Sequence, residues 1–159
     1  MLICDTHCDT LFSMAMHPER ERDVTEETVR LGGISVQTMA MFVGGSPRLE
    51  DVRACFEKMY AALSRLLSRG VKQVLSPAEG VEGENRIMLS VEGCDLLADG
   101  MDVLDRWDDM GVRMAALTWN YENAVGVPHH LDFKQGLKPF GREAVRAMMK
   151  KGIAVDVSH

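Results

Sequence analysis

Short apolar stretches alternate along this chain with longer stretches in which apolar residues recur every three or four positions. The short stretches are apolar at nearly every position, as strands are when a sheet is covered on both faces. They span residues 2–5, 34–43, 87–91, 112–117 and 153–157, with a shorter extended piece at 71–75. This alternation predicts an α/β fold in which crossover helices join parallel strands.

The clearest helical pattern runs from Leu49 to Leu67, and Gly70 follows it as a residue that favours a helix end. Three shorter helices, each followed directly by glycine, are predicted at 24–31, 96–110 and 140–151. The segment 118–136 is rich in Asn, Gly, Pro and His and is too long for an ordinary connection in such a fold. We therefore expect this loop to cover a functional site.

Composition narrows the class of protein. The 159 residues are 46% hydrophobic and 26% charged, an ordinary globular mix, and the net charge of -6 argues against a nucleic-acid partner. No apolar run is long enough to span a bilayer, and the N-terminus lacks the features of a signal peptide. The four cysteines have no CxxC spacing and are expected to be free. We expect one cytoplasmic domain without a membrane partner, and a homo-oligomer stays open.

The first apolar stretch leads directly into His7 and Asp9. In an extended segment, residues two positions apart point to the same side, so the imidazole and the carboxylate can converge. A neutral imidazole nitrogen and a carboxylate oxygen are ligands that zinc-type divalent ions accept. The pair alone also fits a hydrogen-bonded strand end without a metal. The polar residues at the ends of later predicted strands favour the metal site over this alternative.

Further polar residues follow the carboxyl ends of later predicted strands. Glu92 follows 87–91, Trp119 and Asn120 come just after 112–117, and His159 follows 153–157. Functional residues of parallel α/β sheets and barrels gather at these strand ends. The spacing therefore predicts a metal site built from His7, Asp9, Glu92 and His159.

Five segments together resemble successive blocks of the renal (membrane) dipeptidase family of zinc peptidases. They are DTHCDT at 5–10, SVEG at 90–93, ALTWN at 116–120, GLKPFG at 136–141 and VDVSH at 155–159. Their order and spacing extend the resemblance from the first residues to the last. The Trp-Asn pair at 119–120 is more similar to bacterial members than to animal ones.

The resemblance implies a (β/α)8 TIM-barrel metallohydrolase, of which this chain supplies roughly the first five strand–helix units. Residues 1–159 are then the N-terminal part of a single barrel with no second domain. Two zinc ions would hydrolyse the peptide bond of a dipeptide through a metal-bound hydroxide. His7 and Asp9 would bind the first ion, Glu92 would bridge both and carry the catalytic role, and His159 would bind the second.

Substrate contacts are predicted for Trp119, Asn120 and Tyr121, at the start of the long loop that is expected to line the pocket. Animal members place an oxyanion-binding histidine at the position of Trp119; indole neither ligates a metal nor exchanges a proton near neutrality. Trp119 therefore either shapes the pocket or is an aromatic strand-end residue. His129 and His130 match no family ligand and are expected to be a solvated pair.

Several readings of the length and the function stay open. A complete barrel takes about 250 residues, so the chain is expected to be part of a longer enzyme, a natural truncation, or a half-barrel that pairs with another chain. Alone, it is expected to be a poor dipeptidase. The alternatives to a dipeptidase are another metal-dependent amidohydrolase or esterase on the same barrel, and a non-catalytic interaction protein that keeps the scaffold.

Overall fold

The computed structural model describes residues 1–43 and 45–159. All strand pairs within its six-stranded sheet are parallel, and the strand order is β1-β2-β4-β5-β6, with β3 paired to the first residues of β4. The strands are β1 Cys4–Asp5, β2 Val36–Phe42, β3 Lys72–Gln73, β4 Arg86–Glu92, β5 Val112–Ala116 and β6 Ala154–Asp156. The predicted fold class is confirmed: parallel strands and helices form a curled half-barrel.

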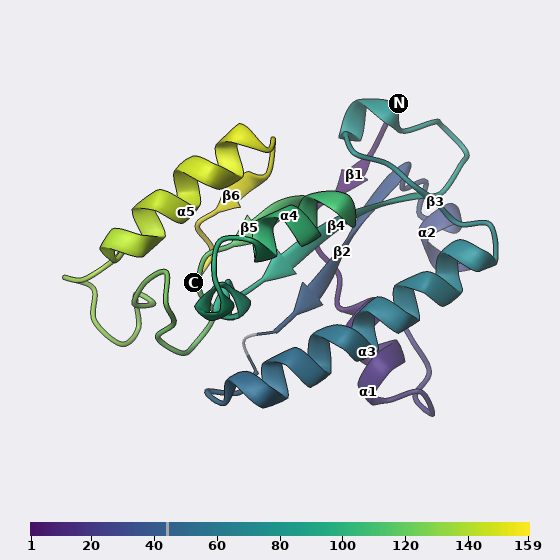
Figure 1. Ribbon diagram of the computed structural model, residues 1–159. Helices are drawn as coiled ribbons and strands as arrows, with labels where there is room; N and C mark the ends of the chain where they lie inside the picture. The colour runs from purple at the N-terminus through teal and green to yellow at the C-terminus, as the bar shows by residue number, and fades with distance from the viewer. Residues whose placement is uncertain (44) are drawn as a thin grey trace.

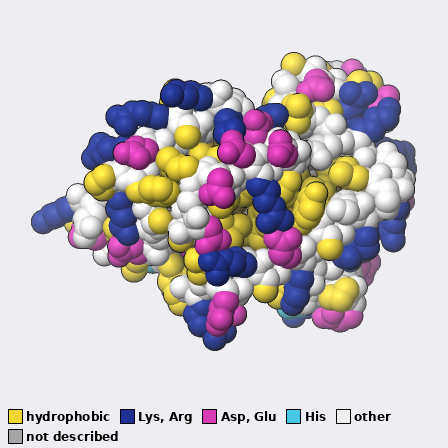
Figure 2. Space-filling model, in the orientation of Figure 1, with side chains coloured by type: hydrophobic (Ala, Val, Ile, Leu, Met, Phe, Trp, Pro, Cys, Tyr) yellow, Lys and Arg dark blue, Asp and Glu magenta, His cyan; other side chains and the backbone are white. Residues whose placement is uncertain are grey.

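The helices connect these strands as crossovers (Figure 1). They are α1 Thr10–Met16, α2 Glu26–Leu31, α3 Leu49–Ser68, α4 Val103–Asp109 and α5 Pro139–Lys150, with 3-10 turns η1 Pro77–Glu79 and η2 Asp95–Asp99. The long helix α3 packs against α1 and β2, α4 packs against β5, and α5 lies beside β6. Figure 2 shows this side of the molecule, where lysine, arginine and acidic side chains are intermixed and hardly any histidine is visible.

The two faces of the central strands differ in what they pack against. Met39, Met41, Leu89 and Val91 belong to the main hydrophobic core, which also contains the buried residues of α3 and α4. The alternate residues of β2 and β4 point to the opposite face, because successive side chains of a strand alternate. That opposite face ends in the cross-strand pair Phe42 and Glu92. The alternation therefore places Glu92 on the face away from the helical core.

The structure corrects one prediction about helices and adds one helix that was not predicted. The segment 96–110 is not one helix, because Gly100 has φ 127° and separates η2 from α4. An L-residue is strained at this φ, so the glycine permits the break. The segment after Asp9 was not predicted to be regular, yet Thr10–Met16 forms α1. Asp9 at the N-cap position is the signal that indicates this helix start.

The register between β4 and β5 shifts by one residue. Leu89 pairs with Val112, but the next residue, Ser90, pairs with Met114, so Arg113 has no partner in the ladder. An extra residue of this kind is a β-bulge. Beyond it the register is regular, and Glu92 pairs with Ala116.

No helix among residues 1–43 and 45–159 is both long enough and apolar enough to cross a membrane.

Candidate metal centre

Three different backbone settings position the predicted ligands at one rim of the sheet. Glu92 is the last residue of β4, His7 lies in the link between β1 and α1, and Asp9 occupies the N-cap position of α1. The Asp9 side chain makes no capping hydrogen bond to the helix. Its carboxylate is therefore not engaged by the backbone groups that an N-cap residue usually satisfies.

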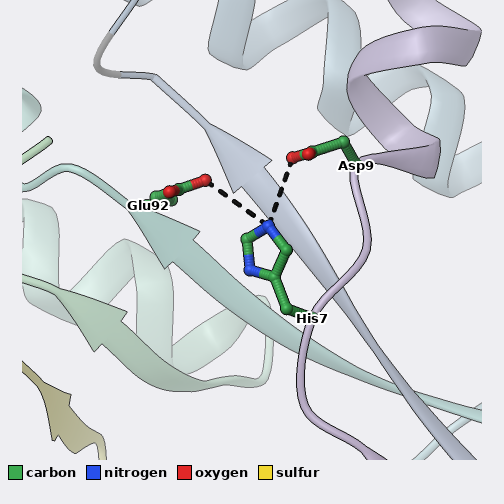
Figure 3. A group of neighbouring side chains, drawn as sticks. All are labelled: His7, Asp9 and Glu92. Carbon is green, nitrogen blue, oxygen red and sulfur yellow. Dashed lines mark ion pairs between the residues drawn. The ribbon is translucent and has the colours of Figure 1, made fainter. Parts of the chain in front are cut away.

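The side chains of His7, Asp9 and Glu92 converge, with one ligand atom from each lying within 4.8 Å of the others. Figure 3 shows the imidazole of His7 pointing its Nε2 between the two carboxylates, 3.5 Å from Asp9 Oδ1 and 3.7 Å from Glu92 Oε2. The side chain of Glu92 is 13% exposed, against 45% for His7 and 59% for Asp9. The cluster therefore opens to solvent on the side of the N-terminal link.

His159 approaches the same glutamate from the other side. Its Nε2 lies 3.2 Å from Glu92 Oε1, the oxygen that does not face His7. The backbone N–H of His129 donates to the carbonyl of His159, which ties this residue to the loop after β5. Glu92 therefore lies between two histidines from distant parts of the sequence and presents one oxygen to each.

Burial raises the pKa of the Glu92 carboxyl above its ordinary value. The positive charges that His7 and His159 can carry lower this pKa, whereas the negative charge of Asp9 raises it. The carboxylate is thus partly desolvated, and its negative charge together with that of Asp9 favours a nearby positive charge. A divalent cation would supply that charge.

The donor set fits a divalent metal. Two imidazole nitrogens and two carboxylates are the ligand types that zinc accepts. The half-buried carboxylate of Glu92 presents one oxygen to each imidazole. A cavity of about 420 Å³ adjoins the cluster and is lined by Thr6, His7, Glu92, Met114, Asp156, Ser158 and His159. The part of the chain that the structure describes therefore holds three converging candidate ligands and a fourth candidate on the far side of Glu92.

Aromatic side chains border the cluster. The Trp119 ring lies 6.1 Å from the His159 ring and 4.8 Å, edge on, from Phe42. Tyr121 is exposed, and its ring lies 6.4 Å from that of Trp119. Asn120 is half-buried and lines neither cavity that contains His159. A substrate contact by Trp119, Asn120 or Tyr121 stays a prediction.

Phe42 is a further residue at this rim, and the sequence pattern did not predict its place there. Its ring packs between those of Phe12 and Trp119, at the end of β2 and beside Glu92 in the sheet. The signal available was its place near the end of a predicted strand, the position that drew attention to Glu92. The ring contacts with two other segments arise only in the folded chain, so sequence spacing could not reveal them.

The loop after β5 lies against the end of β6. Together they line a cavity of about 210 Å³ that includes Thr118, Val127, His129, Leu137 and His159. His129 and His130 are exposed and do not join the cluster of His7, Asp9 and Glu92, although His129 contributes to this cavity. The loop thus reaches the rim that carries the candidate ligands.

Sequence comparison finds relatives, one of which is described as a dipeptidase. An uncharacterized dipeptidase of Schizosaccharomyces pombe is 39% identical over 75 residues, which is 45% of this chain and 18% of that protein. A protein of Acinetobacter calcoaceticus is 30% identical over 79 residues, which is 46% of this chain and 25% of that protein. The matched segments therefore cover a minor part of these relatives.

Solved structures share the fold. A probable dipeptidase from Pseudomonas aeruginosa matches the whole chain with TM-score 0.78 and 23% identity over 47% of its own length. A metallo peptidase from Rhodobacter sphaeroides, liganded with a phosphinate mimic of the dipeptide L-Ala-D-Ala, matches it with TM-score 0.78 and 18% identity over 59% of its own length. The chain thus spans about half the length of these structures.

The family model of membrane dipeptidase matches residues 1–159, which is the whole sequence. The match includes the HxD pair after β1, Glu92 at the end of β4 and the histidine after β6. This chain belongs to the membrane dipeptidase family, peptidase family M19.

Proposed function

We propose that this chain carries half of the active site of a zinc-dependent dipeptidase. The observation that carries the proposal is the placement of Glu92, whose two carboxylate oxygens face His7 and His159 from opposite sides. A carboxylate in this position is suited to bridge two cations. Family membership and the dipeptide mimic bound by the Rhodobacter sphaeroides protein support the choice of a dipeptide as the substrate.

In this proposal, His7 and Asp9 hold one zinc ion, Glu92 contacts both and His159 holds the second. When bound, the two ions supply Lewis acidity and lower the pKa of a water nucleophile. Glu92 would hold the two ions next to each other. Because its carboxylate is partly desolvated, its attraction to a cation would be stronger than in water. Trp119, Asn120 and Tyr121 would form the wall against which the dipeptide is oriented.

The proposed whole enzyme is a closed (β/α)8 barrel, to which this chain contributes about half. The parallel order of β1 to β6 and the length of the matched structures support this architecture. The four cysteines are free, which supports the proposed cytoplasmic location.

The test measures metal content and turnover together. The full translated product that contains residues 1–159 is loaded with zinc and offered dipeptides, N-acylated amino acids, lactones and phosphoesters. We expect two zinc ions per chain and turnover of dipeptides. Preferential turnover of the acylated amino acids or lactones would instead favour another hydrolase on the same fold. Absence of both metal and turnover would favour a non-catalytic scaffold.

Residues 1–159 expressed alone should bind metal but hydrolyse dipeptides poorly. The second ion has only Glu92 and His159 as ligands among the described residues, whereas zinc usually takes four ligands. Turnover equal to that of the full product would contradict the need for further ligands.

A further inference from the structure

His7 and His159 share a local feature of the backbone that precedes them. β1 ends at Asp5 and β6 ends at Asp156, so each histidine follows a strand whose last residue is an aspartate. The Oδ1 of Asp5 accepts a hydrogen bond of 3.1 Å from the backbone N–H of His7. The Oδ1 of Asp156 accepts bonds from the backbone N–H and the hydroxyl of Ser158, at 2.8 and 2.7 Å. Both strands therefore end in the same type of side-chain turn.

We infer that Asp5 and Asp156 are positioning residues, whose turns set His7 and His159 against the two oxygens of Glu92. The inference deepens the proposed function and rests on it. An aspartate that accepts a bond from the backbone N–H two residues later fixes the chain direction in place of a backbone turn. In both segments this happens where the ladder of the sheet stops and the chain leaves toward the rim.

The need for such turns follows from the surroundings of the histidines. His7 lies outside regular structure with a side chain that is 45% exposed, so few packing contacts restrict it. Binding a metal must then offset the entropy lost when a mobile side chain is ordered. A turn formed before the metal arrives reduces that loss, since part of the ordering is already complete.

Glu92 is held differently and shows why only the histidines need these turns. It is itself the last residue of a strand and pairs with Phe42 on one side and Ala116 on the other. Its carbonyl also accepts a hydrogen bond from Val43 N–H. The central strand thus fixes the glutamate through the sheet, whereas β1 and β6 have two and three residues and both histidines lie beyond the last residue of their strand.

Neither aspartate belongs to the cluster of three converging ligands. Asp5 is exposed, and Asp156 has one oxygen engaged twice by Ser158 although it lines the cavity beside His159. A role through the hydrogen bond predicts that asparagine can replace either residue, because its Oδ1 is an equivalent acceptor. A role as a charged ligand predicts that asparagine cannot.

The test uses Co²⁺ as the metal probe, with affinity from calorimetry and coordination from visible absorption. Asp5 and Asp156 are each changed to Asn, Ser and Ala in the full translated product. Asp132→Ala is the matched control, because Asp132 Oδ1 accepts the same bond, of 2.9 Å, from Lys134 N–H in a turn that precedes no candidate ligand.

We expect Asp5→Ala and Asp156→Ala to weaken Co²⁺ binding about 10- to 100-fold, the usual loss when the support of a metal ligand is removed. The asparagine variants should bind like the wild type with its absorption spectrum, and the serine variants should fall between, since serine makes the weaker turn. Asp132→Ala should leave binding unchanged. Wild-type affinity in the alanine variants, or equal losses in asparagine and alanine variants, would overturn the inference.

A second measurement tests the positioning role of the two aspartates independently of whether the site binds metal. If the wild type takes up no Co²⁺, the proposed function fails, and amide hydrogen exchange at His7 and Ser158 decides the positioning claim. Loss of the accepting oxygen should speed exchange about fivefold in the alanine variants, as expected for one hydrogen bond, and not in the asparagine variants. If an alanine variant does not fold, the serine variant gives the same comparison; exchange unchanged by the loss of the acceptor would overturn the claim.

Discussion

The two sides of Glu92 are built unequally. On the side of β1, His7 and Asp9 converge with the glutamate and lie two positions apart in one short segment. On the side of β6, His159 meets the glutamate alone, and its carbonyl is tied to a distant loop through His129. Besides Glu92, the first half-site thus has two candidate donors from one short segment, three in all. The second has one candidate donor besides Glu92, two in all, and depends on tertiary contacts.

Because the two half-sites depend on different contacts, different substitutions should disturb them. A short segment with its own turn keeps its geometry as long as β1 and β2 pair, and Cys4 and Asp5 pair with Val36 and Gln37. The β6 side also depends on the loop after β5, in which Asn123 bonds to Asp95 and Leu117 and Val125 packs against Gly141 of α5. Changes remote from the cluster should therefore affect the second half-site before they affect the first.

The largest expected effect comes from the residue that the two half-sites share. Glu92→Gln removes the negative charge that faces both histidines, so Co²⁺ affinity should fall by more than about 100-fold at both half-sites, beyond the loss from a supporting residue. Dipeptide turnover of the full product should vanish with it. Calorimetry with Co²⁺ checks this. Glu143→Gln, at an exposed position of α5, is the control and should bind normally; near-normal binding by Glu92→Gln would refute the bridge.

Removing one histidine at a time should separate the half-sites. His159→Ala should abolish binding of one equivalent of Co²⁺ and leave the other, because His7, Asp9 and Glu92 still converge. His7→Ala should abolish binding of the more tightly bound equivalent of Co²⁺. After this change, neither half-site has three donors among the described residues. Stoichiometry from absorption titrations gives the answer, with His130→Ala as an exposed histidine control. Equal behaviour of the two variants would mean that the inequality is not functional.

A change in the loop anchor should disturb the β6 side alone. A Cβ on Gly141 would lie 2.0 Å from the carbonyl oxygen of Val125, so Gly141→Ala must push the loop away from α5. Overpacking of this kind destabilises a protein by about 1–3 kcal/mol. We expect a lower unfolding midpoint in urea and a weaker second equivalent of Co²⁺, with the first unchanged. Gly136→Ala, where a Cβ meets nothing within 4 Å, should change neither.

The smallest effect concerns the link between the end of β4 and the loop. Burial raises the pKa of Asp95 above its ordinary 3.8, while the hydrogen bond from Asn123 lowers it. The native state therefore binds more protons than the unfolded state just above pH 3.8, and stability falls as the pH rises through that window. Asp95→Asn removes this loss, so it should stabilise the fold at neutral pH and make little difference in acid.

Urea unfolding from about pH 3 to about pH 7 measures that difference. Asp99→Asn is the control with the opposite sign, because the Arg53 guanidinium holds the pKa of Asp99 below its ordinary value. Its substitution should destabilise the fold at neutral pH and lose that effect as the pH falls. If the difference in unfolding free energy between Asp95→Asn and the wild type does not change with pH, burial of the Asp95 carboxylate carries no electrostatic cost.

The parallel sheet could be predicted from the sequence because apolar strands and glycine-ended helices alternate clearly. The same strand-end rule predicted that Glu92 and His159 would meet, and the structure brings them together. The family and the fold class are confirmed, whereas the metal-binding and substrate-binding roles stay predictions.

The role of the Asp9 carboxylate and the bonding of the loop after β5 could not be predicted, because in each case a polar side chain has several possible hydrogen-bond partners. The sequence does not tell whether the carboxylate of Asp9 caps α1 or is free of the helix, and the structure shows that it makes no cap. Asn123 bonds to the carbonyl of Leu117 and to the amides of Val125 and Gly126. These bonds organise a loop with no periodicity, so pattern analysis gives only its length.

The bulge at Arg113 has a consequence for how chain length can vary in this family. Because of the extra residue, Met114 shares a face with Ser90 and lines the cavity that contains Glu92. Deleting Arg113 would make Val112 and Met114 consecutive, so they would alternate as Leu89 and Ser90 do and the phase downstream in β5 would be kept. Deleting a residue beyond the bulge, where the register is regular, would instead move every following side chain to the other face. Homologous sequences aligned through this strand should therefore differ in length by one residue at the bulge and not at the residues after it.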